Sequence, residues 1–118
     1  MPSLRITVQP LGDACLLQVY GGLSLGPALG ELTEKATEVL KAQRPAALLC
    51  DISAVGSLDS AGLGELVALY VLGIRHRIPV LLVGPAPRTQ QLLKTTRLDG
   101  ILPSYATPAE ALRSIHRE

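Results

Sequence analysis

The chain has 118 residues, with 11 basic and 10 acidic side chains and a formal net charge of +1. This length fits one compact domain, so we expect residues 1–118 to form a single domain. Hydrophobic residues make up 47% of the chain, but Phe and Trp are absent, which predicts a core of Leu, Val, Ile and Ala. The balanced charge and the few aromatic rings disfavour nucleic-acid binding.

The start of the chain lacks the basic segment and long apolar run of a secretory signal, and the apolar runs elsewhere are too short to span a bilayer. We therefore expect a cytoplasmic protein that does not insert into a membrane. Cys15 and Cys50 are too few and too far apart for a metal site. Each lies in an apolar run, which predicts two buried free thiols.

The first 45 residues predict a β-hairpin followed by a helix. Residues 4–8 alternate between apolar and polar side chains, and residues 14–20 form a second apolar run that ends at Gly21-Gly22. A turn at Gly12-Asp13 joins these strands into an antiparallel hairpin. Helical spacing of apolar residues follows, from Pro27 to Pro45. Within that helix we expect Glu31 to pair with Lys35.

Three further pairs of a strand and a helix follow. The predicted ranges are strands over 46–52, 79–83 and 101–105, helices over 60–75, 88–96 and 108–115, and a loop over 53–59. The second helix is expected to bury one face formed by Leu63, Leu66, Val67, Tyr70 and Ile74. Thr107 and Glu110 form a capping box at the start of the last helix.

The element order is therefore ββαβαβαβα. Alternating units of this kind require a largely parallel sheet with right-handed crossovers, and the hairpin adds one antiparallel strand at an edge. The sequence thus predicts an α/β fold with a mixed, mostly parallel sheet of four to five strands and about four helices.

The segment from residue 48 to residue 64 carries the candidate site. It begins in a buried strand that is closed by Asp51 and finishes in the first turn of a helix. Asp59 and Ser60 stand at the junction, where either side chain is a typical helix cap. Gly62 and Gly64 are expected to leave the start of the helix sterically open.

This segment resembles the hallmark of the STAS family, the sulfate-transporter and anti-sigma-factor-antagonist domains. The resemblance lies in Asp51-Ile52-Ser53, a hydrophobic loop, and then Asp59-Ser60-Ala61-Gly62-Leu63-Gly64. It continues in residues 77–84, which are similar to the family's fourth strand. Residues 92–98 and 101–102 are similar to its third helix and last strand.

The resemblance implies a partner-switching regulator. In antagonist members the serine after the motif's aspartate is the phosphoacceptor, which here is Ser60. The unphosphorylated form binds an anti-sigma factor that is also a serine kinase, phosphorylation releases it, and a serine phosphatase restores the complex. The implied partner-binding residues are Asp59, Ser60, Ala61, Gly62, Gly64 and Ser24. No cofactor or metal is implied, and we expect a monomer.

The chain departs from the family pattern at three places. Where the family often has Gly-Glu-Leu-Asp after the second strand, a surface that helps to bind the kinase, this chain has Gly21-Gly22-Leu23-Ser24. Arg97 replaces a frequent glycine before the last strand. Ala61 stands where a second Ser or Thr is common, which leaves the acceptor itself intact.

An enzymatic function is disfavoured by the residues present. The Ser60 segment lacks the first glycine of a hydrolase nucleophile turn, and His76 and His116 are the only histidines. No catalytic or metal-ligand cluster stands out.

Two non-catalytic alternatives remain open beside the switch. The chain could be an accessory STAS subunit of a membrane lipid or anion transporter complex, docked on its ATPase, with Ser60 as a contact or a cap only. The second alternative is nucleotide binding near the Ser60 turn, as in some relatives, although no phosphate loop supports it.

Overall fold

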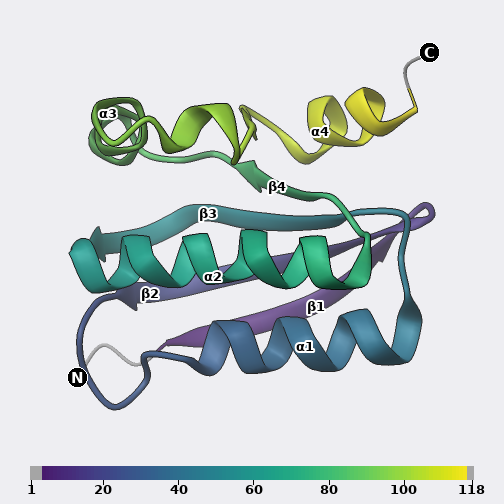
Figure 1. The fold of residues 1–118 in the computed structure, drawn as a ribbon, viewed down its shortest axis with the longest axis horizontal. Coiled ribbons are helices and arrows are strands. Elements are labelled where there is room, and N and C mark those ends of the chain that lie inside the picture. The colour runs from purple at the N-terminus through teal and green to yellow at the C-terminus, as the bar shows by residue number, and fades with distance from the viewer. Residues whose placement is uncertain (1–3, 117–118) are drawn as a thin grey trace.

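The computed structural model describes residues 4–116, which form one five-stranded sheet with helices on both faces (Figure 1). The strands are β1 Arg5–Leu11, β2 Ala14–Leu23, β3 Leu48–Leu58, β4 Val80–Val83 and β5 Ser104–Tyr105. The helices are α1 Glu31–Gln43, α2 Ser60–His76, α3 Pro87–Thr95 and α4 Pro108–Ile115, with a 3-10 turn at Leu98–Gly100. The predicted order ββαβαβαβα is confirmed.

The strands lie in chain order across the sheet, so that β3 is central. β1 is antiparallel to β2 at one edge, and β2, β3, β4 and β5 are parallel, as predicted. Along β3 the side chains alternate between two cores. Leu48, Cys50 and Ile52 face the core beneath α1 and α2, whereas Leu49 faces the core beneath α4. Burial on both faces explains the continuous apolar sequence of this strand.

The predicted loop over residues 53–59 is wrong, because β3 continues to Leu58. Beyond residue 20, β2 also continues through its two glycines to Leu23, and the two extensions pair in parallel. The sequence hides this pairing, since small residues such as Gly, Ala and Ser have low strand propensity and this part of the ladder has shifts in register. The extension carries the chain past the core to one end of the molecule.

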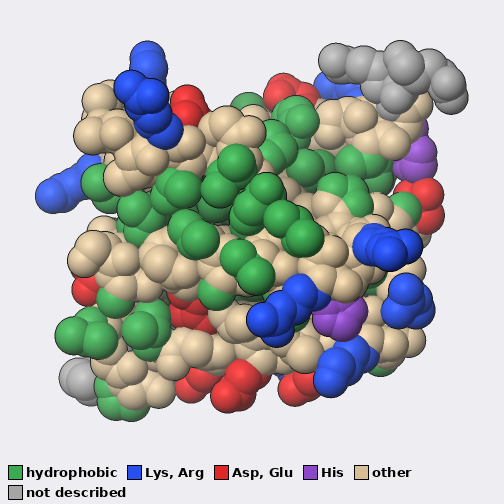
Figure 2. All heavy atoms as spheres, viewed as in Figure 1, with side chains coloured by type: hydrophobic (Ala, Val, Ile, Leu, Met, Phe, Trp, Pro, Cys, Tyr) green, Lys and Arg blue, Asp and Glu red, His purple; other side chains and the backbone are tan. Residues whose placement is uncertain are grey.

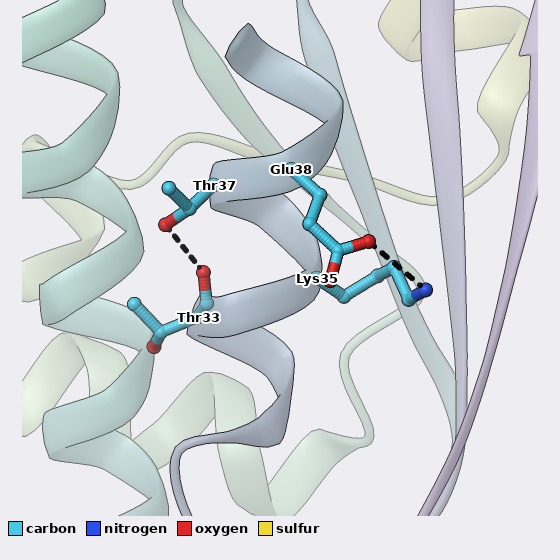
Figure 3. Close-up of polar contacts among 4 residues, drawn as sticks. All are labelled: Thr33, Lys35, Thr37 and Glu38. Carbon is cyan, nitrogen blue, oxygen red and sulfur yellow. Dashed lines mark hydrogen bonds and ion pairs between the residues drawn. The ribbon is translucent and has the colours of Figure 1, made fainter. Parts of the chain in front are cut away.

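Helix α1 begins at Glu31, four residues later than Pro27 suggested. The expected pairing of Glu31 with Lys35 is replaced by one between Lys35 and Glu38, with 3.4 Å between Nζ and Oε1 (Figure 3). Such an exposed pair contributes little to stability. In the same view the Thr37 hydroxyl donates to the Thr33 carbonyl at 2.8 Å, which satisfies a polar side chain inside the helix.

The buried face of α2 differs in part from the predicted one. Leu63 and Leu66 are buried as expected, but Ile74 is 59% exposed. Leu69 and Gly73 face the core in its place. The reason is close packing: a Cβ at Gly73 would lie 2.6 Å from the carbonyl oxygen of Ile78, so the bare backbone faces the sheet and turns Ile74 outward.

The remaining predictions concern the thiols and the last two elements. Cys15 and Cys50 are buried free thiols, as predicted, and burial raises the pKa of Cys50 to about 12, which keeps it unreactive. The last strand is shorter than predicted, because the N–H groups of Ile101 and Leu102 both donate to the Leu98 carbonyl and so complete the 3-10 turn. The Thr107 hydroxyl accepts a hydrogen bond from the Glu110 N–H at 3.2 Å and so caps α4.

The two glycines at the start of α2 give a matched test of this packing. A Cβ at Gly62 would lie 1.9 Å from the Leu23 carbonyl oxygen, whereas one at Gly64 would meet nothing within 4 Å. We expect Gly62→Ala to lower the free energy of unfolding by about 3 kcal/mol or more. Gly64→Ala should raise it by about 0.5–1 kcal/mol. Urea denaturation measures both, and equal effects would contradict the packing described.

Candidate functional site

Asp59 links the end of β3 to the start of α2. Its backbone is extended and its Oδ1 accepts a hydrogen bond from the Gly62 N–H at 2.9 Å, so Asp59 is the helix cap. Its Oδ2 accepts a second bond from the Leu25 N–H at 3.0 Å, across the molecule from the loop after β2. These backbone donors, that of Leu25 above all, lower the pKa of the Asp59 carboxyl group.

Ser60 is the first residue of α2 and its side chain is exposed. Because Asp59 caps the helix, the Ser60 hydroxyl is not needed for that purpose, and it makes no hydrogen bond to any residue between 4 and 116. The end of β3, the start of α2 and the loop after β2 lie together at the left-hand end of Figure 1. Ser60 therefore stands accessible at the positive end of a 17-residue helix.

The other predicted site residues differ in accessibility. Gly64 is exposed and Ala61 is partly buried. Gly62 is buried against the Leu23 backbone, so the expectation that it leaves the helix start open is wrong. Its lack of a side chain lets α2 approach β2, and the approach toward Ser60 is open over Ala61 and Gly64 instead.

Ser24 lies beside Asp59, as the prediction of a common surface requires. The Asp59 N–H donates to the Leu23 carbonyl at 3.3 Å, and Ser24 and Asp59 line the same cavity. The loop that follows Ser24, residues 24–30, contains no charged side chain, and Leu25 is 80% exposed in it. The surface next to Ser60 is thus apolar with one carboxylate, where the family often presents acidic side chains.

Asp51 does not belong to this site. Its Oδ1 accepts hydrogen bonds from the Ser53 N–H at 2.9 Å and the Ser53 hydroxyl at 2.6 Å. Since β3 runs on to Leu58, Asp51 lies on the order of 20 Å from the junction at about 3.3 Å per strand residue. A loop over 53–59 would have brought it nearer, but the extended strand keeps its charge away from Ser60.

Glu65 is a structural partner of the site that the sequence reading missed. This side chain of α2 is only 6% exposed, and its two oxygens accept bonds from the Gly30 N–H at 3.0 Å, the Thr33 N–H at 3.1 Å and the Thr33 hydroxyl at 3.1 Å. Gly30 has no side chain with which to cap α1, so Glu65 caps that helix from its neighbour. The available signal was one carboxylate among the otherwise apolar residues 61–74.

One hollow borders the site, and an apolar groove lies against α2. The hollow, of about 340 Å³, lies between the end of β3 and the start of α3 and touches the site through Ser24 and Asp59. The groove, of about 290 Å³, lies near the far end of α2, beside Ile74, Ile101 and Pro103. Figure 2 shows hydrophobic side chains gathered on this face between α2 and the helices α3 and α4.

No group of three or more His, Cys, Asp or Glu side chains within residues 4–116 is placed to hold a metal ion. Over the same residues, no helix is both long enough and apolar enough to cross a membrane. The site thus consists of an accessible hydroxyl, a capping carboxylate and an uncharged loop, which is an arrangement suited to modification and protein contact.

Solved anti-sigma-factor antagonists share this α/β fold. The chain is similar to a solved antagonist from Mycobacterium paratuberculosis, with 27% identity, 98% of this chain and 96% of the other covered, and a TM-score of 0.76. A putative antagonist from Thermotoga maritima has 24% identity, 95% coverage of each chain and a TM-score of 0.74.

SpoIIAA from Bacillus in its phosphorylated form shares the fold at 14% identity, with 94% of this chain and 99% of the other covered and a TM-score of 0.71. No curated protein matches the sequence. The family model of the STAS domain matches residues 5–111, which is most of the chain. The chain belongs to the STAS domain family.

Replacing the Glu65 carboxylate tests its role as a cap. Glu65→Gln puts an amide nitrogen where one of two accepting oxygens stands, so we expect the free energy of unfolding to fall by about 1–3 kcal/mol. Glu38→Gln is the control, because its exposed pair with Lys35 should be worth less than about 1 kcal/mol. Urea denaturation distinguishes the two variants. Equal stability of both would mean that the α1 cap is not needed.

The lowered pKa of Asp59 makes its contribution to stability depend on pH. A carboxyl group with a lower pKa in the folded chain stabilises the fold above its ordinary pKa, and that contribution is lost as the pH falls through the folded-state value. Asp59→Asn should therefore be less stable than the wild type near neutral pH, with a difference that shrinks in acid. Urea denaturation over about pH 3–7 measures it. Asp99→Asn, at an exposed site, is the control; a gap independent of pH would count against this cap.

Proposed function

We propose that the chain is a partner-switching regulator of the anti-sigma-factor-antagonist type, controlled by phosphorylation of Ser60. The main observation behind the proposal is that Asp59, and not Ser60, caps α2. The Ser60 hydroxyl is exposed and makes no hydrogen bond within residues 4–116. In its unphosphorylated form the domain binds an anti-sigma-factor serine kinase. Phosphorylation releases the kinase, and a serine phosphatase reverses the change.

The domain itself tolerates the phosphate. A phosphoserine carries nearly two negative charges at neutral pH, and the start of a helix stabilises such charge through its dipole and its free N–H groups. Ser60 already points into solvent, so no core side chain has to move. The Asp59 carboxylate is a repulsive neighbour, but both of its oxygens accept backbone hydrogen bonds. We infer that the modified domain keeps its fold.

A protein docked over Ser60 does not tolerate the phosphate. Covering Ser60 means covering Asp59, Gly64 and the apolar loop with Leu25, and this surface holds one exposed negative charge. A phosphate would add two more charges that must be desolvated without a partner. An uncompensated buried charge costs several kcal/mol, and each 1.4 kcal/mol corresponds to about a tenfold change in affinity.

The comparisons support this proposal at the level of the family. The similar structures from Mycobacterium paratuberculosis and Thermotoga maritima are antagonists, the second a putative one, and SpoIIAA exists with this fold in phosphorylated form. We further propose that the domain spans residues 1–118 and is non-catalytic, monomeric and cytoplasmic. Docking on a transporter ATPase is the alternative, and it differs in being indifferent to modification of Ser60.

Labelling with ATP tests the switch. The chain is incubated with radiolabelled ATP and each anti-sigma-factor kinase of its own genome. We expect one kinase to label the wild type and Ser104→Ala, a variant of an exposed serine on β5, but not Ser60→Ala. Ser60→Asp should bind that kinase at least about tenfold more weakly, since it adds one charge to the covered surface. Circular dichroism checks that the fold is kept.

The contrary outcomes are equally clear. If Ser60→Ala is still labelled, the acceptor lies elsewhere. If Ser60→Asp binds as tightly as the wild type, charge at this position does not control binding. Co-purification with a transporter ATPase that ignores both changes would support the alternative.

A further inference from the structure

We propose that the apolar groove near the far end of α2 is a second protein-docking surface. Its occupant is an amphipathic helix of a partner protein, with acidic side chains beside its apolar face. The groove has a volume of about 290 Å³ and lies between α2, the start of β4 and the segment before β5. It is separate from the surface around Ser60 and does not depend on the proposed switch.

Two exposed isoleucines line the groove together. Ile74 on α2 is 59% exposed and Ile101, before β5, is 36% exposed. Tyr70 and Pro103 extend the apolar wall. Figure 2 shows that hydrophobic side chains gather on this face between α2 and the helices α3 and α4. Single exposed apolar side chains are ordinary, but a contiguous apolar hollow is typical of a contact surface.

The backbone groups at the floor of the groove are already used. Pro79 and Pro103 have no N–H, and their carbonyls each accept a bond of 2.9 Å from the neighbouring strand. The Ile78 N–H donates to the Gly73 carbonyl at 2.9 Å. A partner strand would need free backbone groups to pair with, whereas a helix satisfies its own backbone and binds through side chains. The groove therefore suits a helix better than an added strand.

The charge around the groove is positive. Arg77 lines it, Arg75 follows Ile74 on α2, and neither arginine forms an ion pair with residues 4–116. The sequence has no acidic residue between Glu65 and Asp99, whereas the same stretch holds five Lys and Arg residues, at positions 75, 77, 88, 94 and 97. The negative end of the α2 dipole offsets only about half a charge. This end of α2 thus favours a partner with acidic side chains.

The groove is distant from Ser60. Ile74 lies 14 residues further along the same helix, which is about 21 Å at 1.5 Å per residue. Exposed charges are largely screened from one another beyond about 10 Å at ordinary ionic strength. A helix held in the groove therefore stays bound whether or not Ser60 is modified. The domain has one surface that modification controls and one that it does not.

Three synthetic peptides of about 18 residues, a length at which an isolated helix can form, test the groove. The first has leucines at positions i, i+3, i+4 and i+7 with glutamates beside them. The second has lysines in place of the glutamates, and the third has alanines in place of the leucines. Each is titrated into the chain and followed by backbone amide NMR. We expect saturable shifts at Ile74, Arg77 and Ile101 with the first peptide only, with a Kd on the order of 100 µM.

Arg77→Gly and Arg44→Gly are matched variants that test the charge. Both arginines follow a helix in the left-handed region, with φ of 58° and 45°, where glycine is preferred. Both changes should therefore keep or raise the melting temperature. Arg77 lines the groove and Arg44 does not. We expect Arg77→Gly to weaken binding of the glutamate peptide about threefold, and Arg44→Gly to leave it nearly unchanged.

Ile74→Gln and Val71→Gln test the apolar contact. Both residues are exposed on α2, and glutamine is a good helix former. Val71 lines a different hollow, with Thr33 of α1. We expect Ile74→Gln to weaken binding about tenfold and Val71→Gln to leave it unchanged. Ser60→Asp should bind the glutamate peptide as tightly as the wild type.

Several outcomes would overturn the proposal. These are no binding of the glutamate peptide at about 1 mM, equal binding of the lysine peptide, equal weakening by Val71→Gln, or loss of binding in Ser60→Asp. Association with phosphatidylglycerol vesicles that is lost in Ile74→Gln would assign the groove to a membrane surface instead. Self-association in sedimentation velocity that is lost in the same variant would assign it to a second copy of the chain.

The titrations need neither kinase nor modification. If Ser60 is labelled but the glutamate peptide does not bind, the switch stands and the docking groove is refuted. If the peptide binds but Ser60 is not labelled, the groove stands and the switch is refuted.

Discussion

The site depends on the carboxylate of Asp59, which accepts one hydrogen bond from the helix that it caps and one from the loop after β2. The two bonds, 2.9 Å to the Gly62 N–H and 3.0 Å to the Leu25 N–H, join segments that are 34 residues apart in sequence. Because one side chain satisfies both, Ser60 is released from capping. A hydroxyl that held the helix end could not be modified without loss of that end, so the aspartate makes the serine available.

Glu65 repeats this arrangement nearly two turns further along the chain in α2. It holds the backbone at Gly30 and Thr33, while Asp59 holds the same loop near its other end. The loop is thus fixed at both ends by carboxylates from a single helix. A ligand bound at the start of α2 would therefore meet a surface whose two parts are both held by this helix.

The sequence was sufficient for the order of elements, because apolar periodicity reports directly on burial. It was also sufficient for the junction, where Asp59 and Ser60 follow a buried strand. It was not sufficient for the second half of β3. The side chains there are small and mostly exposed, so the strand is formed by backbone pairing that leaves no apolar pattern in the sequence. It was also not sufficient for the role of Glu65 or for the hollow between the end of β3 and the start of α3. Both are formed by residues that are distant in sequence and come together only in the folded chain.

Every hydrogen bond that Asp59 and Glu65 accept from the loop and the start of α1 comes from a main-chain N–H, except the one from the Thr33 hydroxyl. A main-chain N–H can donate the same hydrogen bond when the side chain of its residue is exchanged. Duplicated genes could therefore exchange the amino acids at positions 24–29, Leu25 included, while the scaffold stays intact. Paralogues could then diverge in binding preference without a loss of folding stability. This is one route by which proteins of the same fold can come to bind different partners.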